Sequence, residues 1–554
     1  MPGNTSTGDQ EPLLTSKRRL TDESDSDEGE TLFERRTLII PHDADEGARA
    51  RLSYEEAVEA AGFGWFHWLL LLVCGWANAS DAVEILCVSF LLPSARCDLL
   101  LSSSDMGLLT ASIFLGMMVG GYVWGYLADR RGRRNVLVVS LSVNGLFGAL
   151  ASAAPWFWLF LLLRFISGVG VGGSIPVIFS YFAEFMPRLR RGMMISALAT
   201  FWMAGNFLAA GLAWLVIPRT WMHFSVGRLN FQSWRVFVVL CSVPSVTSAA
   251  IFRLVMPESP KFLMEAGRER EAVHVFRQMF RLNMLGKGEA LPVSPKGKNG
   301  CTSDFSEFSL HVNIKQTAHE TETRQPSAQL AATLKKALMP LRQMFDGNLR
   351  SRSVVLLIIF YCISFGYYGL WMWFPELFSR AEAGSSPCAN MSAPSQQHTN
   401  SCSPVKTVVY EESFLIAAAN LPGNIFTILV VDNIGAKPLL SVSLLVSSLS
   451  VFLIYVVQSK SQSLLLSCLF SGVSVIAWNA LDVVGTELFP TQLRSSALGV
   501  FTGAGRVGAI MGNVVFGNML DSGCAVPILL VSVMLMSAGV SALFLPHTRQ
   551  MELA

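Results

Sequence analysis

The sequence predicts an all-α membrane protein with twelve transmembrane helices arranged as two six-helix pseudo-repeats. Hydrophobic residues make up 51% of the 554 residues and the mean hydropathy is +0.44, which excludes an ordinary soluble protein. The apolar residues fall in blocks of roughly 20, the length that a helix needs to cross the hydrocarbon core. Two polar signatures recur at a single offset, which indicates that the chain contains two copies of one membrane unit.

Both signatures lie between apolar blocks. Asp-Arg-Arg-Gly-Arg-Arg at 129–134 is echoed by Asp-Asn-Ile-Gly-Ala-Lys at 432–437. Glu-Phe-Met-Pro at 184–187 is echoed by Glu-Leu-Phe-Pro at 487–490. The offset is 303 residues in both cases, from 129 to 432 and from 184 to 487. Two parallel membrane repeats are a common plan of secondary transporters, whose substrate site lies between the repeats near the bilayer midplane.

The apolar blocks give the expected helices. In chain order they are 66–92, 106–127, 135–153, 157–183, 193–216, 235–255, 353–378, 412–431, 438–457, 463–485, 496–520 and 526–545. Basic residues gather after the second and fourth blocks. They are Arg130, Arg131, Arg133, Arg134, Arg188, Arg190 and Arg191. Because short cytosolic loops are enriched in Lys and Arg, both termini are expected in the cytosol.

These helices divide the chain into segments. The expected segments are a disordered cytosolic tail at 1–64, helices 1–6 at 65–256, a cytosolic linker at 257–352, helices 7–12 at 353–546 with a non-cytosolic loop at 379–411, and a short cytosolic tail at 547–554. The glycine runs within the second and fourth helices are expected to permit close helix contact.

The tail and the long loop contain candidate processing and sorting signals. In the tail, Leu13-Leu14 and Leu38-Ile39 each follow an acidic residue four positions earlier, which resembles the dileucine signals that clathrin adaptors read. In the loop, Asn390-Met-Ser is a glycosylation sequon, whereas the sequon at Asn78 lies within the first helix and is expected to be unusable. Cys388 and Cys402 of the loop are candidates for a disulfide, with Cys97 as an alternative partner.

Several motifs resemble those of the major facilitator superfamily. The loop Gly-Tyr-Leu-Ala-Asp-Arg-Arg-Gly-Arg-Arg at 125–134 and the glycine pattern at 164–173 are typical of that superfamily. Pro-Glu-Ser-Pro at 257–260 is similar to its sugar and organic-ion branches. Segments such as Ser-Phe-Gly-Tyr-Tyr-Gly-Leu at 364–370 and Ala-Trp-Asn-Ala-Leu-Asp at 477–482 resemble the synaptic vesicle glycoprotein 2 group more closely.

The chain departs from that group in its long loop. The group has a long luminal insertion of pentapeptide repeats after helix 7, whereas the loop at 379–411 is short and has no repeat. Activities that the group performs through that insertion, including neurotoxin docking, are therefore not implied. The loop at 432–437 also lacks most of the arginines of its counterpart in the first half.

Charged residues inside apolar blocks are the first candidates for a solute site, because a charge at the bilayer centre costs about 2.5–3.5 kcal/mol on insertion scales. Asp81 and Glu84 lie one turn apart in the first helix, and two carboxyls this close are able to carry a proton between them. The alternative is a structural ion pair with Arg164 or Arg506. Trp478 and Asp482 share one face of the tenth helix, where a ring and an acceptor suit a small polar ligand.

The resemblance adds aromatic residues to this candidate cavity. The place where the synaptic vesicle glycoprotein 2 group binds racetam-type drugs maps to Trp202, Tyr367, Tyr368, Trp478 and Asp482. Arg506 stands where that group has a basic residue. The alternative is that these aromatic residues only anchor helices at the membrane interface.

The repeated signatures predict a cytosolic gate. The expected charge network consists of Asp129, Arg130, Arg133, Arg134, Arg164, Glu184, Arg191, Glu487 and Arg494. Such a network would close the cytosolic side in one state and break when the two halves rock. The alternative, that the arginines only set the topology, does not explain the acidic residues at matched offsets.

The leading hypothesis is a vesicle-membrane secondary transporter that moves a small polar solute, a sugar or an organic ion, with proton coupling. It is expected to meet membrane lipid and, through its tail, clathrin adaptors and vesicle-fusion proteins. The alternative is a non-transporting vesicle protein of transporter fold that regulates secretion or trafficking through this tail. The sequence shows no nucleophile–base or metal-ligand set, so no enzyme, cofactor, metal or nucleic-acid partner is expected.

Overall fold

A computed structural model describes most of the chain. The described residues are 51–52, 54–219, 224–226, 229–285, 309–310, 342–347, 349–383, 405–457, 459–489, 491–521, 523 and 525–546. Within them, twelve helical spans are long and apolar enough to cross a membrane, which confirms the predicted number.

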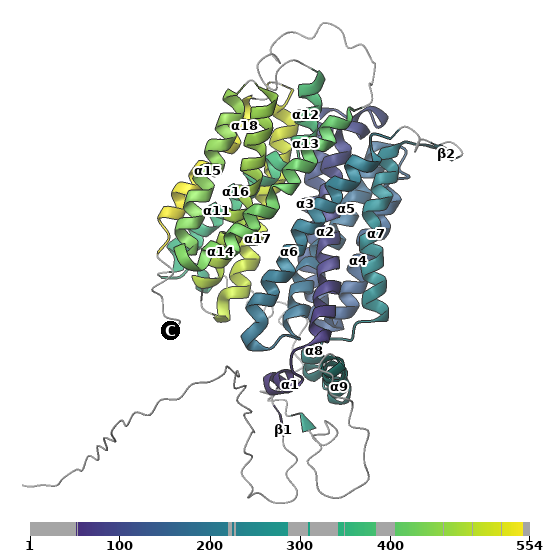
Figure 1. Ribbon diagram of the computed structural model, residues 1–554, viewed down its shortest axis with the longest axis vertical. Coiled ribbons are helices and arrows are strands. Elements are labelled where there is room, and N and C mark those ends of the chain that lie inside the picture. The colour runs from purple at the N-terminus through teal and green to yellow at the C-terminus, as the bar shows by residue number, and fades with distance from the viewer. Residues whose placement is uncertain are drawn as a thin grey trace, which may run out of the picture. The chain divides into compact units, whose positions relative to one another are not determined.

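The first half contains six of these spans. They are α2 (Trp65–Asp98), α3 (Ser103–Arg131), α4 (Arg133–Ala151), α5 (Phe157–Ala183), α6 (Arg188–Val216) and α7 (Ser233–Leu254). A short antiparallel pair, β2 (Phe224–Val226) and β3 (Leu229–Phe231), precedes α7. Three further helices lie at one end of the bundle, as Figure 1 shows. They are α1 (Tyr54–Ala60), α8 (Pro260–Glu265) and α9 (Glu269–Leu285). We call this the α9 end.

The second half contains the other six spans. They are formed by α11 (Leu349–Trp371) with α12 (Phe374–Ala383), α13 (Thr407–Ala418) with α14 (Asn420–Ile434), α15 (Ala436–Val456), α16 (Lys460–Glu487), α17 (Thr491–Met519) and α18 (Ala525–Leu543). The predicted helix 7 is thus interrupted before Phe374, next to Pro375, which has no backbone N–H to continue the helix. The end of the bundle that contains α12 is called the α12 end (Figure 1). A further short pair joins β1 (Arg51–Leu52) to β4 (Ser309–Leu310).

The two halves repeat each other in backbone geometry. Gly132 ends α3 with φ 92° and ψ 151°, and Gly435, 303 residues later, ends α14 with φ 95° and ψ 151°. Both values of φ lie in the region that glycine favours, so the same sharp turn joins the second and third span of each half. The offset found in the sequence therefore corresponds to a structural repeat.

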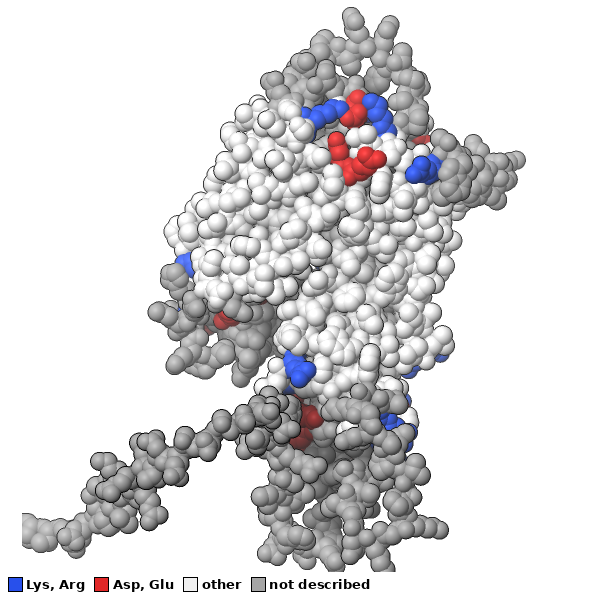
Figure 2. Space-filling model, in the orientation of Figure 1, with Lys and Arg blue, Asp and Glu red and all other residues white. Residues whose placement is uncertain are grey.

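Glycines allow close helix contact, as predicted. A Cβ placed on Gly168 of α5 would lie 2.5 Å from the carbonyl oxygen of Ile113 in α3. Across the two halves, a Cβ on Gly107 of α3 would lie 2.8 Å from Cα of Gly517 in α17. Small residues at these crossings let the backbones touch. Figure 2 shows one side of the molecule, where a wide belt without charged residues has charged side chains near its two ends.

Candidate functional site

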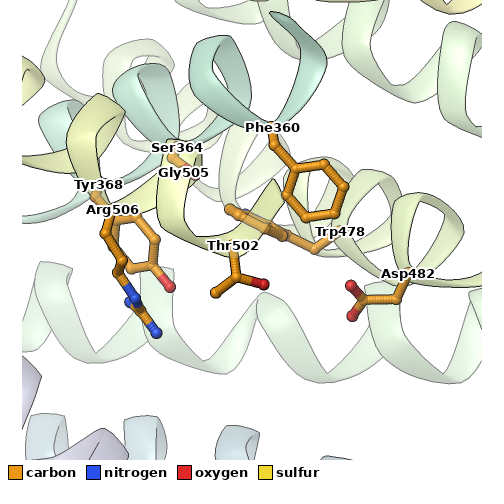
Figure 3. A pocket seen from close by; sticks show the side chains of 8 residues that line it. All are labelled: Phe360, Ser364, Tyr368, Trp478, Asp482, Thr502, Gly505 and Arg506. Carbon is orange, nitrogen blue, oxygen red and sulfur yellow. The ribbon is translucent and has the colours of Figure 1, made fainter. Parts of the chain in front are cut away.

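A cavity of about 150 Å³ lies within the second half, between α11, α16 and α17 (Figure 3). Its lining consists of Phe360, Ser364, Tyr368, Trp478, Asp482, Thr502, Gly505 and Arg506. The three helices each contribute residues at a spacing of three or four, which places them on one helix face. The cavity is therefore formed by three helix stripes that face one another.

Four of the lining residues are those that the sequence predicted: Tyr368, Trp478, Asp482 and Arg506. Figure 3 shows Arg506 and Asp482 on opposite sides of the cavity, with Thr502 between them. The cavity thus has a guanidinium at one end and a carboxyl group at the other. The buried Nε1 of Trp478 has no hydrogen-bond partner within the described residues, so a donor is left free beside the cavity.

The other two predicted aromatic residues do not line the cavity. The Tyr367 ring is buried, and its centroid lies 6.3 Å from that of Trp478, so it supports the wall. Trp202 of α6 is half-buried and packs against the hydrophobic core. From the first half, Phe114 of α3 contacts Tyr368 with ring centroids 4.9 Å apart.

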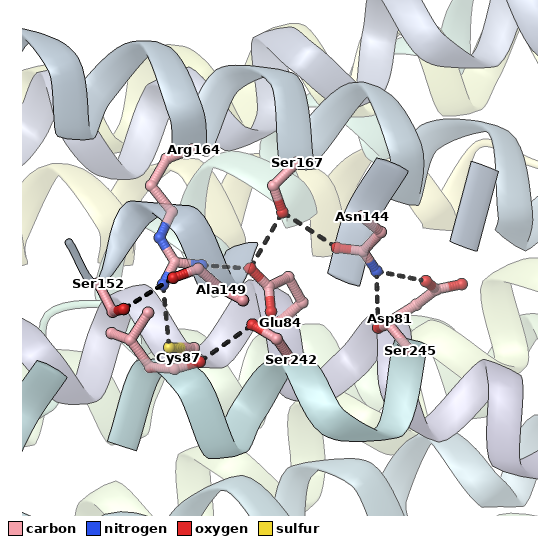
Figure 4. A network of polar contacts seen from close by, with 11 residues as sticks. Asp81, Glu84, Cys87, Asn144, Ala149, Ser152, Arg164, Ser167, Ser242 and Ser245 are labelled. Atoms are coloured by element: carbon pink, nitrogen blue, oxygen red, sulfur yellow. Dashed lines mark hydrogen bonds and ion pairs between the residues drawn. The ribbon is translucent and has the colours of Figure 1, made fainter. Parts of the chain in front are cut away.

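Asp81 lies in a different place, inside the first half. Its carboxylate accepts a hydrogen bond from Ser174 Oγ at 2.7 Å. It accepts another from Asn144 Nδ2 at 3.3 Å, and Asn144 also donates to Ser245 Oγ at 3.0 Å (Figure 4). These residues come from α2, α4, α5 and α7, and all four are fully buried. The prediction that Asp81 lines the solute cavity is therefore corrected.

Glu84 belongs to the same buried network. It forms an ion pair with Arg164 of α5 and accepts a hydrogen bond from Ser167 at 3.0 Å (Figure 4). Ser167 is also 3.0 Å from Asn144 Oδ1, which links Glu84 to Asp81. The structural ion pair named as the alternative for Glu84 is thus the observed arrangement, and Glu84 does not line the cavity either. Both corrections have one cause, the rotation of α2, which points this face into the first half.

The network contains two carboxyls and one cation. Arg164 pairs with Glu84, and no cation of the described chain lies within ion-pair distance of Asp81. An isolated buried charge is costly, whereas a paired one is tolerated. The negative charge of Glu84 is thus compensated by Arg164, whereas that of Asp81 is not. Protonation of Asp81 would remove this uncompensated charge.

At the α9 end, part of the predicted gate network is present. Arg133 lies 3.3 Å from Glu184 and 3.5 Å from Asp129, and Glu184 also accepts a hydrogen bond from Ser259. Burial raises the pKa of Glu184, while Ser259 and Arg133 act in the opposite direction. The Tyr54 hydroxyl of α1 donates to the Glu184 carbonyl, and its burial raises the pKa of the phenol. All these contacts lie within the first half.

The other predicted members of the gate are arranged differently. Arg134 donates to the backbone carbonyls of Phe252 and Arg253 at 3.0 and 2.6 Å, and Arg130 stacks on Tyr126 at 4.5 Å. Arg191 lies 3.3 Å from Glu55.

The predicted place of Arg164 in this gate is wrong. Its buried side chain pairs with Glu84 near the middle of the first half. Glu487 is exposed, and the side chain of Arg494 lies outside the described residues.

The α12 end has a charge cluster that the sequence analysis did not identify. Buried Glu376 of α12 lies 3.1 Å from Arg96 of α2 and 2.8 Å from Arg380. Arg380 also lies 3.0 Å from Asp521 and donates to Ser103 of α3 at 2.6 Å. Since Arg96 and Ser103 belong to the first half, this cluster joins the two halves; we call it the α12-end clamp.

Comparisons with known proteins agree with this architecture. The model of the Major Facilitator Superfamily matches residues 69–395, and that of the "Sugar (and other) transporter" family matches residues 400–554. Synaptic vesicle glycoprotein 2C of Rattus norvegicus is 32% identical over 94% of this chain and 84% of its own length. Synaptic vesicle glycoprotein 2B of Homo sapiens is 32% identical over 90% of this chain and 86% of its own length. The chain belongs to the major facilitator superfamily and, within it, to the family of synaptic vesicle glycoproteins 2.

Membership of the superfamily makes the chain a multi-pass membrane protein of transporter type. Among solved structures, the partially occluded inward-open xylose transporter XylE from E. coli has a TM-score of 0.61, with 18% identity over 87% of this chain and all of that one. This likeness shows the fold. It agrees with the two six-helix repeats described above.

The superfamily's repeat was readable from the sequence, but four lining residues were not identified: Phe360, Ser364, Thr502 and Gly505. The first two lie eight and four residues before Tyr368, and the other two lie four and one before Arg506. Helical spacing from the predicted residues would have found most of them.

The remaining predictions concern the sorting signals, the cysteines, the sequons and metal binding. Leu13, Leu14, Leu38, Ile39, Cys388, Asn390 and Cys402 lie outside the described residues. Cys97 is disulfide-bonded. Asn78 is buried in α2, where it donates to the Leu198 carbonyl at 3.1 Å. Across the described ranges, no group of three or more His, Cys, Asp or Glu residues is arranged to hold a metal ion.

Proposed function

We propose that this protein is a proton-coupled secondary transporter of a vesicle membrane that moves a small polar solute by alternating access. The observation that supports this most strongly is the cavity in the second half, with Asp482 and Arg506 at its two ends. Its volume of about 150 Å³ is below the roughly 300–1,000 Å³ of drug-sized sites, which favours a small solute. Trp478 and Tyr368 offer ring faces against which a sugar or a flat organic ion stacks.

The contacts between the halves favour an alternating-access cycle. Among the described residues, nearly all polar contacts between the two halves lie toward the α12 end, including the clamp and the 2.7 Å hydrogen bond from Ser89 to the Met372 carbonyl. We therefore assign this conformation to a state closed at the α12 end. The basic loops favour a cytosolic location of the α9 end. Opening the cavity toward the α12 end then requires that the ion pairs of the clamp break.

Proton coupling is assigned to Asp81. It is the carboxyl without a cation in the buried network, and its hydrogen bonds from α4 and α5 link its protonation to helix packing. Glu84 keeps its pairing with Arg164 and holds the network in place.

The test is uptake of a panel of sugars and organic ions into proteoliposomes under a pH gradient. The wild type is compared with Asp81→Asn, which removes the proton site, and Asp482→Asn, which alters the cavity. We expect Asp81→Asn to abolish the dependence on the gradient while solute binding persists. Asp482→Asn is expected to weaken binding itself.

The second candidate, a non-transporting regulatory protein, is favoured by the loop at 432–437, which lacks most arginines of its counterpart. It predicts that a folded wild type binds solute without any flux, and that charge changes at Asp81 leave cellular function intact. Uptake that is equal in the wild type and Asp81→Asn would leave transport standing and remove the proton assignment.

A further inference from the structure

A second cavity, a groove of about 560 Å³, lies where α2 begins, at the α9 end. Its apolar lining consists of Phe63, Trp65, Trp68, Leu71 and Leu72. It belongs neither to the solute cavity nor to the buried network, and the proposed transport function does not use it.

The groove is exposed at the start of a candidate membrane span. Of the side chains of Trp65, Trp68 and Leu72, 64%, 47% and 59% are exposed, although they occupy the first turns of a membrane-spanning helix. Tryptophan is enriched where hydrocarbon meets the headgroups, because its ring is apolar and its N–H is polar. An apolar groove at the start of such a span lies where a lipid chain would be able to cover it.

The groove is a fixed feature of the fold. Its far side is Asn283 of α9, whose Oδ1 accepts from the Phe66 N–H at 3.2 Å and whose Nδ2 donates to the carbonyls of Ala61 and Gly62 at 2.9 and 3.0 Å. A Cβ on Gly64 would lie 2.9 Å from Cα of Asn283, so α9 and the start of α2 are in direct contact. These bonds fix the groove's width.

The guanidinium of Arg190 lies beside the groove. Three arginines lie near the start of α6, and two of them, Arg188 and Arg191, each lie 3.3 Å from Glu55. The third, Arg190, is exposed, and its guanidinium lies 4.4 Å from the ring centroid of Phe63, which lines the groove. No carboxylate of the described residues forms an ion pair with Arg190. Its charge is therefore available to a ligand whose apolar part lies in the groove.

We propose that this groove binds one anionic phospholipid of the leaflet at the α9 end, with an acyl chain against Trp65, Trp68 and Leu72 and the phosphate on Arg190. The apolar groove alone would accept any lipid chain. The unpaired guanidinium adds the preference for a net negative headgroup, because one arginine near a membrane surface contributes about 1 kcal/mol of attraction. This corresponds to about a fivefold preference.

The experiment uses the full chain in nanodiscs of phosphatidylcholine that contain a photoactivatable probe lipid. The probe is phosphatidic acid or phosphatidylcholine with the same diazirine-bearing chain, and the labelled peptide that spans residues 63–76 is quantified by mass spectrometry. We expect the wild type to be labelled about fivefold more by phosphatidic acid. Arg190→Gln should remove this preference, while Trp68→Ala should lower labelling by both probes.

The matched control is Arg130→Gln. Arg130 lies at the end of α3 and stacks on Tyr126 at 4.5 Å, as Arg190 stacks on Phe63, but it does not line this groove. It should keep the wild-type preference. Equal labelling of the wild type by both probes, a preference that survives in Arg190→Gln, or an absence of labelling in this peptide would each overturn the proposal; the last result would show that protein covers the groove.

Discussion

Arg164 shows how a single residue determines the energetics of the first half. It is fully buried, pairs with Glu84, lies 3.4 Å from Cys87 Sγ and has its guanidinium 5.4 Å from the Phe160 ring centroid. A buried pair of this kind contributes little net stability, but the loss of one partner leaves an uncompensated charge. Arg164 therefore compensates the negative charge of Glu84 inside the bundle.

The first prediction concerns this pair. Arg164→Met should destabilise the protein by about 3–5 kcal/mol, because it leaves Glu84 buried without a cation. Thermal unfolding in detergent is the measurement. The double variant Glu84→Gln/Arg164→Met should recover most of the loss, since no charge remains to be compensated. An unchanged unfolding temperature in Arg164→Met would contradict the assignment.

At the scale of the element, the turns at Gly132 and Gly435 adopt the same backbone conformation in different surroundings. A Cβ at Gly132 would lie 2.5 Å from Glu258 Oε2, whereas the nearest atom at Gly435 is Pro438 Cδ at 3.9 Å. Glu258 also accepts a hydrogen bond from the Arg134 N–H at 2.9 Å. Only the first of the two turns is tied to the segment after α7.

The second prediction separates conformation from packing at these turns. Gly→Ala should cost about 1–3 kcal/mol at either position, because φ is positive and ψ is extended, a combination that only glycine adopts readily. Gly132→Ala should cost more than Gly435→Ala, since it also displaces the Glu258 carboxylate. Unfolding temperatures of the two variants provide the comparison. Equal losses would show that the contact with Glu258 is unimportant.

At the scale of the whole molecule, the α12-end clamp holds the halves together. Arg380 contacts Glu376, Asp521 and Ser103, so it links α12 and the end of α17 to the start of α3. Gly107 and Gly517 bring α3 and α17 into backbone contact near the same end. Ion pairs and close helix packing therefore both hold the two halves together at the α12 end.

The third prediction is that Arg380→Gln opens the α12 end. A cysteine placed at Thr502 in the cavity should react faster with a membrane-impermeant maleimide added from that side. A tenfold increase would correspond to about 1.4 kcal/mol. Lys460→Gln is the matched control, because Lys460 pairs with Glu382 within the second half alone. A similar increase in both variants would mean that the clamp does not control access.

The fourth prediction concerns pH. Burial opposes ionisation of Asp521, but hydrogen bonds from Ser103 and Arg380 outweigh it, and its pKa falls below the ordinary value of 3.8. The contribution of Asp521 to the closed state is thus complete above its ordinary pKa and is lost only as the pH falls through the lowered one. Acidifying the α12 side from about pH 7.5 to about pH 5.5 should leave the labelling rate, normalised to a free thiol, unchanged. A faster rate that Asp521→Asn reproduces at neutral pH would refute this.

The twelve spans, the repeat and four of the residues that line the cavity could be predicted from the sequence, because hydropathy indicates helix length and motif spacing indicates repetition. The network of Asp81, Glu84 and Arg164 inside the first half could not, since it depends on the rotation of α2, which selects their neighbours. The same holds for the α12-end clamp, in which Arg96 lies 280 residues before Glu376 and Glu376 lies 145 residues before Asp521, so that they share no local pattern. Helix rotation and the contacts between halves arise from packing, which no single segment encodes.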